Sequence, residues 1–398
     1  MTPDWSLVGR RTLLRSGAAI GVGTLAGCLD GLTQADDPEG VAVEEVVDGL
    51  ANPWAIEFFP EGSHALVTER SGQLNLLDTD EGEIEPLDGA PEVFTGGQGG
   101  LLDVAFDPDF EDEPWVYLTY SAANGEGSTT HLGRGRFEGR EEGLVDFEEL
   151  YAAEPFVDSG QHFGSRVVFD EDGLLYMTVG DRGFKDFGPE HVSQDTENDL
   201  GTTLRLEPDG SIPEDNPFVD EEGFNDAIFT YGHRNVQGMT IHPETGDIWQ
   251  AEHGEQDGDE INALEEGGNY GWPVTHTGCE YNTDDPVGEH PEDREDVVNP
   301  VYYWECNTGG FPPAGTTFYD GDAFPDWEGD LFVGTLAGRY LGRFTVDDPG
   351  GDPEVEEAEA LLEDRGWRIR DVTVQPETGY LYVAVDDSDA PLVRLVPE

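Results

Sequence analysis

Short runs of apolar residues recur along most of the chain, separated by turns that contain proline, glycine or aspartate. Two such runs joined by a turn predict a β-hairpin, because strands alternate or bury their side chains with a period of two. No long stretch shows the period of about 3.6 residues that marks an amphipathic helix. The pattern therefore predicts an all-β protein.

The hairpin pattern occurs six times, in residues 56–68, 104–119, 167–178, 239–249, 318–334 and 372–383. A spacing of roughly 50 to 80 residues is in the range of propeller blades with long loops. Six four-stranded antiparallel blades around a central channel account for the length of the chain. A β-sandwich is the alternative, but it does not require six similar units. In a propeller, long loops between blades would build a site over the channel.

Charge is the most unusual feature of the composition. The chain has 88 acidic and 19 basic residues, which gives a net charge of −69. High charge with few apolar residues is typical of disorder, but the regular β pattern argues against it. Such a chain repels nucleic acid and anionic membranes, so we expect no nucleic-acid partner. We interpret the charge as adaptation to molar salt, where screening weakens self-repulsion; an ordinary acidic exported protein is the alternative.

The N-terminus has the pattern of an export signal. Residues 9–15 read Gly-Arg-Arg-Thr-Leu-Leu-Arg and resemble a twin-arginine signal. The apolar run at residues 18–27 is too short to span a bilayer. It ends in Leu-Ala-Gly-Cys at residues 25–28, which resembles a lipoprotein processing site.

These features predict three segments. Residues 1–27 would be the signal peptide, residues 28–42 an acidic tether and residues 43–398 the propeller. Cys28 would carry a lipid that anchors the exported protein to the outer face of the cytoplasmic membrane, which would be its only membrane contact. The alternative is an uncleaved tail with a free thiol. The two other cysteines, at 279 and 306, suggest a disulfide across an insertion, with two isolated thiols as the alternative.

A glycine-rich stretch combines the residues of an anionic-ligand site. Residues 231–238 contain His233, Arg234 and Asn235, and residues 252–262 contain several carboxylates. The guanidinium of an arginine is a permanent planar donor, and carboxylate and main-chain oxygens are preferred by calcium. The stretch therefore suits an anionic cofactor bound with a hard cation, although a turn-rich loop pair with solvated charges is the alternative.

Two further patterns suggest catalysis and ligand binding. His162 opens one predicted hairpin and Asp181 closes it, so the two should lie side by side. A histidine oriented by a carboxylate can act as a general base, and we expect Asp181 to raise its pKa; a surface histidine near a turn aspartate is the alternative. Arg368 and Arg370 share one face of a strand and suggest a clamp for carboxylates or phosphates.

In this order, the motifs resemble the soluble pyrroloquinoline quinone (PQQ)-dependent aldose sugar dehydrogenases, the glucose/sorbosone dehydrogenase family, over residues 45–395; the charge suggests a haloarchaeal-type member. The family fold is a six-bladed propeller, which agrees with the repeat count. The motifs that carry the resemblance are Asn52-Pro-Trp54, Gly97-Gln-Gly-Gly-Leu-Leu102, the hairpin from His162 to Asp181, Tyr231-Gly-His-Arg-Asn235, Gly267-Gly-Asn-Tyr-Gly-Trp-Pro273 and Arg368-Ile-Arg370.

The resemblance implies oxidation of aldoses at C1 to lactones, dependent on PQQ and calcium, with an unknown electron acceptor. It implies that His162 is the base, that Asp181 orients it and that Arg234 stabilises the developing negative charge. The implied cofactor contacts are Gln98, Arg234, Asn235, His253, Leu336, Arg368 and Arg370. The implied calcium ligands are the carbonyls of Gly254 and Glu255 beside PQQ, and Asp259, Glu260 and the Tyr270 carbonyl at a structural position.

The chain departs from the family pattern at two places. Glu255 stands where a proline or similar neutral residue is frequent, and Ala337 stands where a lysine is frequent; whether Arg339 replaces that lysine stays open. Two other functions fit a propeller. One is a calcium-dependent lactonase or other hydrolase, whose metal cage does not require the arginines, and the other is a non-catalytic cell-surface propeller that binds carbohydrate.

Overall fold

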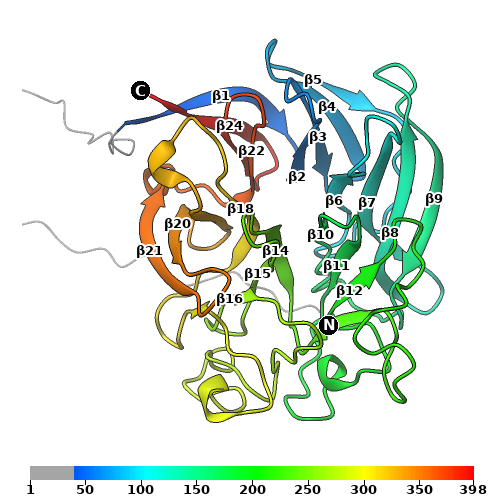
Figure 1. The fold of residues 1–398 in the computed structure, drawn as a ribbon, viewed down its shortest axis with the longest axis vertical. Helices are drawn as coiled ribbons and strands as arrows, with labels where there is room; N and C mark the ends of the chain where they lie inside the picture. Colours follow the sequence, from blue (N-terminus) through cyan, green and yellow to red (C-terminus); the bar gives the residue numbers. More distant parts are fainter. Residues whose placement is uncertain (1–39) are drawn as a thin grey trace, which may run out of the picture. The chain divides into compact units, whose positions relative to one another are not determined.

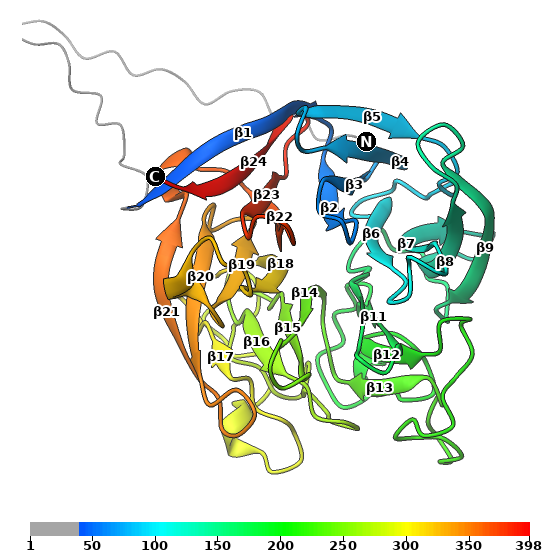
Figure 2. The same cartoon turned by 45° about the horizontal axis from the view of Figure 1, so that its top comes forward.

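The computed structural model describes residues 40–398. These residues form six four-stranded antiparallel sheets, arranged as blades around a central axis in Figures 1 and 2. The predicted six-bladed β-propeller is therefore confirmed. The expected signal peptide, Cys28 and almost all of the tether lie outside the described residues.

Each predicted hairpin supplies the two innermost strands of one blade. Written from the central axis outward, the first two blades are β2 (Pro53–Phe58), β3 (His64–Glu69), β4 (Gln73–Asp78) and β5 (Glu83–Leu87), and β6 (Leu101–Phe106), β7 (Trp115–Ala123), β8 (Ser128–Phe137) and β9 (Leu144–Ala152). The next two are β10 (Val167–Phe169), β11 (Leu175–Val179), β12 (Thr202–Leu206) and β13 (Ile228–Tyr231), and β14 (Val236–Ile241), β15 (Ile248–Glu252), β16 (Glu260–Ala263) and β17 (Tyr302–Tyr303). The last two are β18 (Pro313–Phe318), β19 (Leu331–Thr335), β20 (Leu341–Asp347) and β21 (Glu354–Leu361), and β22 (Ile369–Val374), β23 (Leu381–Val385), β24 (Ala390–Pro397) and β1 (Val41–Leu50).

Helical structure among the described residues is limited to short 3-10 turns, at Val192–Gln194, Pro291–Asp293, Pro325–Trp327 and Glu363–Arg365. This agrees with the absence of a helical period in the sequence. Within residues 40–398, no helix combines the length and the apolar character that crossing a membrane requires.

The last blade is closed by the two ends of the described chain. β1 pairs antiparallel with β24, from Val41 opposite Pro397 to Leu50 opposite Ala390. The blue strand lies beside the red strand in Figure 2. Closure of this kind joins the first blade to the last and covers the strand edges that would otherwise pair with other chains. β1 begins at Val41, slightly ahead of residue 43, where the sequence placed the domain boundary.

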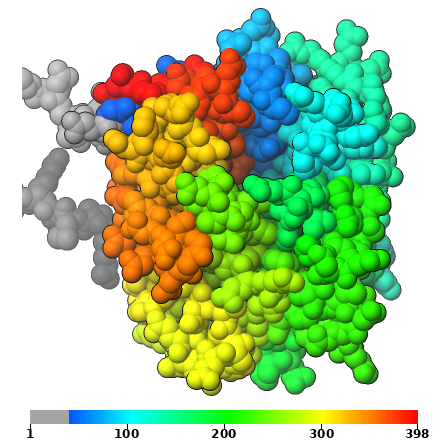
Figure 3. All heavy atoms as spheres, viewed as in Figure 1, coloured from blue at the N-terminus to red at the C-terminus, as the bar shows by residue number. Residues whose placement is uncertain are grey.

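Burial decreases from the axis outward, which explains the composition. β11 and β19 are buried at every position because neighbouring blades cover both of their faces. β21, on the outside, carries glutamate at four of its eight positions and buries only its last residue, Leu361. Figure 3 shows adjacent blades packed against one another in sequence order. The apolar side chains therefore form the contacts between blades, and the outer strands carry acidic surface.

The predicted disulfide is present. Cys279 and Cys306 are bonded, with their Cα atoms 5.4 Å apart, within the range that a disulfide requires. The bond joins the long loop between β16 and β17 to the segment just after β17. This loop contains Tyr270 and follows the other residues predicted to bind calcium, so the disulfide restrains one side of the candidate site.

Candidate active site

The predicted site residues lie on loops that lead into the inner strands. Gln98 precedes β6, His162 precedes β10, Arg234 precedes β14 and Arg368 precedes β22. The inner strands surround the channel, so these loops meet at one end of it. Contacts between the loops confirm this: the Gln98 side-chain oxygen accepts a hydrogen bond from the main-chain nitrogen of His162 at 2.7 Å.

His162 and Asp181 form the predicted pair. The Nδ1 atom of His162 lies 2.6 Å from Oδ1 of Asp181. The other carboxylate oxygen accepts a hydrogen bond from Nε1 of Trp272 at 2.8 Å, so Asp181 is fixed on both sides. Because Nδ1 is engaged by the carboxylate, Nε2 is the nitrogen that can accept a proton from a ligand.

The backbone at His162 adopts the left-handed region, with φ of 47°. Residues other than glycine occupy this region at an energetic cost, and such strain is concentrated at functional sites. Gly180 permits the close approach of the two hairpin ends, because a Cβ atom there would lie 2.2 Å from the carbonyl oxygen of His162. The hairpin thus holds His162 in a conformation set by its surroundings.

The pKa of His162 is lower than the ordinary histidine value, which corrects the sequence-based expectation. Burial is the main cause, and the positive charges of Arg234 and Lys185 act in the same direction. Asp181 acts in the opposite direction, as expected, but does not outweigh them. The ring is therefore neutral, and able to accept a proton, down to lower pH than an isolated histidine.

Arg234 is buried beside this pair. Its Nη1 donates to the carbonyl oxygen of His253 at 3.1 Å, and its Nη2 donates to Oε2 of Glu255 at 2.8 Å. The guanidinium carbon lies 5.3 Å from the centre of the Trp272 ring, the ring that also holds Asp181. The structure therefore brings the predicted base and the predicted charge-stabilising arginine around one tryptophan.

Arg368 and Arg370 share one face of the chain, as predicted. Both pair with the same oxygen of Asp386, at 2.9 Å and 3.2 Å respectively. The sequence analysis missed Asp386, which lies just beyond β23 and faces the arginines across the β22–β23 hairpin. Burial opposes ionisation of Asp386, but the two arginines outweigh it and lower its pKa.

Arg339 is engaged elsewhere, since its Nη1 donates to the carbonyl oxygen of Gly366 at 2.8 Å. Leu336, predicted near the cofactor, presents its carbonyl oxygen to Nη1 of Arg368 at 3.4 Å. Leu336 therefore lies at the arginine pair, as the resemblance implies.

Several buried polar atoms at the site have no partner within the described part of the chain. They are Nε of Arg234, Nε of Arg370 and Nδ2 of Asn235. Buried donors are normally satisfied, so these atoms point to a ligand that carries acceptor oxygens. His253 contributes no charge there, because burial and the neighbouring Arg234 lower its pKa to about 3. The donors fit an anionic cofactor such as PQQ.

The predicted calcium residues form a tight main-chain loop. The main-chain nitrogen of Gly254 donates to Oδ1 of Asp259 at 3.0 Å. A Cβ atom at Gly254 would lie 2.1 Å from the carbonyl oxygen of Asp257, so only glycine allows this approach. Burial raises the pKa of Asp259 to about 6. The turn brings the carbonyl oxygens of Asp257 and Gly258 close to Gly254, and oxygen atoms are the ligands that calcium prefers.

The second predicted calcium position lies next to a small cavity of about 10 Å³, which Glu252, Glu260 and Tyr270 help to line. Burial, followed by the charge of Glu252, raises the pKa of Glu260 well above its usual value. Within residues 40–398, no three histidine, cysteine, aspartate or glutamate side chains are arranged to hold a metal. Calcium at either position therefore remains a prediction.

Lys185 is the main feature of the site that the sequence analysis missed. Its ammonium group pairs with Oε2 of Glu255, the oxygen that also binds Arg234. The signal was in the composition, since Lys185 is the single lysine of the sequence. Composition does not show where a residue lies, and only the fold places Lys185 beside Glu255.

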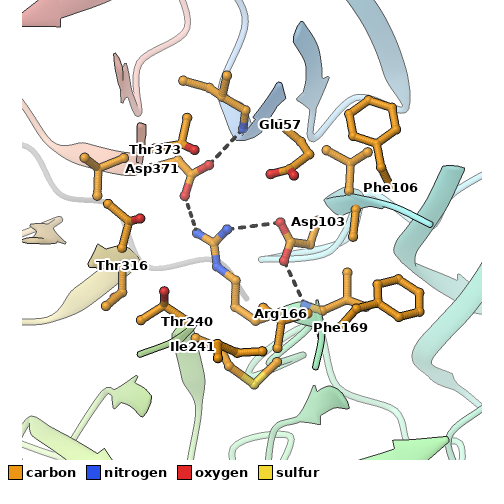
Figure 4. A pocket seen from close by; sticks show the side chains of 18 of the residues that line it. Glu57, Asp103, Phe106, Arg166, Phe169, Thr240, Ile241, Thr316, Asp371 and Thr373 are labelled. Carbon is orange, nitrogen blue, oxygen red and sulfur yellow. Dashed lines mark hydrogen bonds and ion pairs between the residues drawn. The ribbon is translucent and has the colours of Figure 1, made fainter. Parts of the chain in front are cut away.

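Below the site, Arg166 crosses the channel. It binds Asp103 at 3.0 Å and Asp371 at 2.9 Å, and Figure 4 shows these interactions. On the far side is a cavity of about 400 Å³ lined by the second halves of the inner strands. Glu57 points into it (Figure 4), and burial, with the charges of Asp103 and Asp371, raises its pKa to about 8. This cavity is distinct from the loops that carry His162.

Glu57→Gln is expected to stabilise the protein by about 1–3 kcal/mol at alkaline pH. The folded-state pKa of about 8 lies above the ordinary 4.5, so the folded protein keeps a proton that the unfolded chain releases. Stability of the wild type should therefore fall as pH rises between these values, and the amide removes that loss. Thermal melts of the wild type and Glu57→Gln at about pH 5 and pH 9 measure this stabilisation. An equal stabilisation at both pH values would contradict the raised pKa of Glu57.

Comparison with known proteins identifies the family. The family model described as Glucose / Sorbosone dehydrogenase matches residues 50–394. Aldose sugar dehydrogenase YliI of Escherichia coli (strain K12) is 37% identical over 365 residues, which cover 90% of this chain and 94% of the relative. Quinoprotein glucose dehydrogenase B of Acinetobacter calcoaceticus is 27% identical over 410 residues, covering 86% of this chain and 84% of the relative.

Solved structures show the same similarity. The soluble aldose sugar dehydrogenase of Escherichia coli in its apo form superposes with a TM-score of 0.83 at 36% identity, covering 90% of this chain and 100% of that chain. The PQQ-bound form of an aldose sugar dehydrogenase from Streptomyces coelicolor gives 0.71 at 25% identity, covering 91% and 100%. Fold and site thus define an oxidoreductase that acts on sugars. The chain belongs to the glucose/sorbosone dehydrogenase family.

Proposed function

We propose that this protein oxidises aldose sugars at C1 to lactones, with PQQ and calcium as cofactors. The observation that carries the proposal is the His162–Asp181 pair, held at 2.6 Å, beside Arg234. The unpartnered donors of Arg234, Arg370 and Asn235 support an anionic cofactor at the same place. The PQQ-bound structure of a relative supports the same cofactor.

His162 is the general base in this proposal. Its Nε2 accepts the proton of the C1 hydroxyl, while Asp181 holds the proton on Nδ1 and stabilises the imidazolium that forms. PQQ, when bound, supplies the oxidant that accepts the hydride from C1. Arg234, a fixed cation in a buried position, stabilises negative charge that develops on a ligand oxygen, and it requires no reorganisation during the reaction.

The remaining residues bind and orient. Arg368 and Arg370 would hold the carboxylates of the cofactor. Gln98 and Asn235 accept from the main-chain nitrogens of His162 and Gly164 respectively, which places their amides beside the His162 loop, where they would contact the cofactor. The carbonyls of Gly254 and Glu255 would bind calcium, with Asp259, Glu260 and the Tyr270 carbonyl at a structural position. The N-terminal pattern supports export with lipid attachment at Cys28, and the net charge of −69 supports a haloarchaeal-type, salt-adapted protein.

Arg370→Ala is expected to weaken PQQ binding by about 10- to 100-fold, the usual effect of losing a hydrogen bond between charged groups. Arg368→Ala should weaken it less, since Arg368 is partly exposed to solvent. Turnover at saturating PQQ should change by less than about threefold because neither guanidinium contacts His162. Titration of apoprotein with PQQ, followed by absorbance, measures the affinity. Arg294→Ala, in an exposed ion pair with Asp296, is the control.

The function is tested by reconstitution. Apoprotein in molar KCl is loaded with calcium, titrated with PQQ and assayed for reduction of an artificial dye with a panel of aldoses. We expect dye reduction that depends on both cofactors. Loaded protein that reduces no dye with any aldose would refute the proposal. Lactone opening with calcium alone would establish the hydrolase, and sugar binding without either reaction would establish a non-catalytic propeller.

A further inference from the structure

The single lysine of the chain lies at the proposed active site. Lys185 follows Asp181 on the loop after β11, and its positive charge is felt at His162. The chain meets its other cationic positions with arginine. Lys185 therefore supplies the single compact, flexible ammonium side chain of the sequence. Its charge acts on His162, the proposed base.

Lys185 is the solvent-facing end of a row of charges. Its ammonium group and Nη2 of Arg234 both bind Oε2 of Glu255. The side chains of Arg234 and Glu255 are 5% and 3% exposed, whereas that of Lys185 is 49% exposed. The row therefore runs from the buried Arg234 through Glu255 to the solvent-exposed Lys185, whose ammonium group is accessible to a ligand.

Aromatic rings flank this ammonium group. Its nitrogen lies 5.3 Å from the centre of the Tyr281 ring and 5.6 Å from that of Phe187. Tyr281 is 54% exposed, and with Phe184 it makes up two of the three exposed large hydrophobic residues in residues 40–398. Of the two rings beside the ammonium group, Tyr281 is exposed, so this surface offers a ligand an apolar and a polar contact together.

Stability does not explain the pair of Lys185 and Glu255. The buried Glu255 carboxylate already has a buried partner in Arg234, so it does not need the half-exposed ammonium group for charge neutralisation. A sugar ring, in contrast, needs donors and acceptors for its hydroxyl groups and an apolar surface for its C–H face. The half-exposed ammonium group of Lys185 supplies a donor, and the exposed phenol of Tyr281 supplies an apolar face and an acceptor oxygen.

Building on the proposed function, we propose that Lys185, Glu255 and Tyr281 form the subsite for the ring of the aldose. Lys185 donates to ring hydroxyls remote from C1, the buried Glu255 carboxylate holds the ammonium group in position, and the Tyr281 ring packs against the C–H face. Substrate selection then depends on hydroxyl groups away from the oxidised carbon, while His162 and Arg234 act at C1.

Because the chain has one lysine, the subsite can be observed directly. Reductive methylation with ¹³C-formaldehyde keeps the charge and labels Lys185 together with the N-terminal amine; Lys185→Arg identifies the side-chain signal by its loss. The ligand is 1,5-anhydroglucitol, which has the ring of glucose but no hydroxyl at C1 and cannot be oxidised. We expect the Lys185 signal to shift saturably with this ligand and not with glycerol. An unchanged signal at saturating ligand would overturn the subsite.

Kinetics separates sugar binding from positioning. Lys185→Met and Tyr281→Ala are expected to raise KM for aldoses by about 10-fold or more, with kcat within about threefold and unchanged PQQ affinity. Arg140→Gln, in a surface pair with Glu85 and 50% exposed, is the matched control and should change none of these. A fall in kcat or in PQQ affinity at unchanged KM would show that Lys185 acts through Arg234 instead, and would reject the subsite.

The two proposals fail differently. If the wild-type protein neither binds PQQ nor oxidises a sugar, the proposed function fails, and the ¹³C signal still reports whether the ring analogue binds at Lys185. If sugar oxidation proceeds normally while the Lys185 signal and the KM of Lys185→Met stay unchanged, only the subsite is rejected.

Discussion

His162→Ala is expected to lower kcat for aldose oxidation by about 10²–10⁴-fold, the usual contribution of a positioned general base. The residue lies 2.6 Å from Asp181 and offers Nε2 to the ligand, so its removal takes away the proton acceptor. PQQ affinity should remain close to that of the wild type, because the arginines that would hold the cofactor carboxylates are unchanged. Stopped-flow dye reduction at saturating PQQ and sugar measures the effect.

The control is His64→Ala. His64 begins β3 and pairs with Asp78 at the end of β4, so its loss should leave kcat unchanged. A variant of His162 that keeps more than about a tenth of wild-type turnover with normal PQQ affinity would exclude this histidine as the base.

The pH dependence of activity provides a second test of His162 as the general base. A base must be neutral to accept a proton, so activity falls as pH drops through the pKa of His162. Burial and two nearby cations lower that pKa, so the acid limb should lie below the ordinary value of about 6.5. Asp181→Asn should move the limb to still lower pH, because the carboxylate is the group that opposes the shift. A limb above that value in the wild type would contradict the environment described for His162.

Folding only at high ionic strength is the second large effect we expect. With a net charge of −69, self-repulsion at low salt should approach or exceed a typical net stability of about 5–15 kcal/mol. The repulsion is concentrated on outer strands such as β21, where four of eight residues are glutamate. Circular dichroism and thermal melts across a KCl series should show loss of β structure below molar salt.

A matched variant separates screening from other salt effects. Replacing the four glutamates of β21 with glutamine keeps the strand and removes four charges, so the KCl concentration at the folding midpoint should decrease. Sucrose, which favours compact states without screening charge, should not replace KCl. A melting temperature that is the same in low and molar KCl would reject the salt requirement.

The sequence by itself determined the architecture and the chemical types at the site. A strand covered on both faces must be apolar, so each inner hairpin appears in the sequence as two apolar runs joined by a turn. These paired runs recur once per blade. The six repeats therefore became the inner halves of six blades. Local motifs also identified the His162–Asp181 pair, since both residues belong to one hairpin, and the shared strand face of Arg368 and Arg370.

Only the tertiary structure decided the electrostatics and the contacts between blades. The direction of the His162 pKa shift depends on Arg234, which enters from the next blade, and on burial, neither of which a linear pattern contains. Lys185 was missed because its partner Glu255 lies 70 residues away in the sequence, on a loop of the neighbouring blade. Asp386 was missed although it faces Arg368 across the β22–β23 hairpin. Pairwise Coulomb interactions and desolvation depend on spatial separation, and in a propeller that separation is set by closure of the ring.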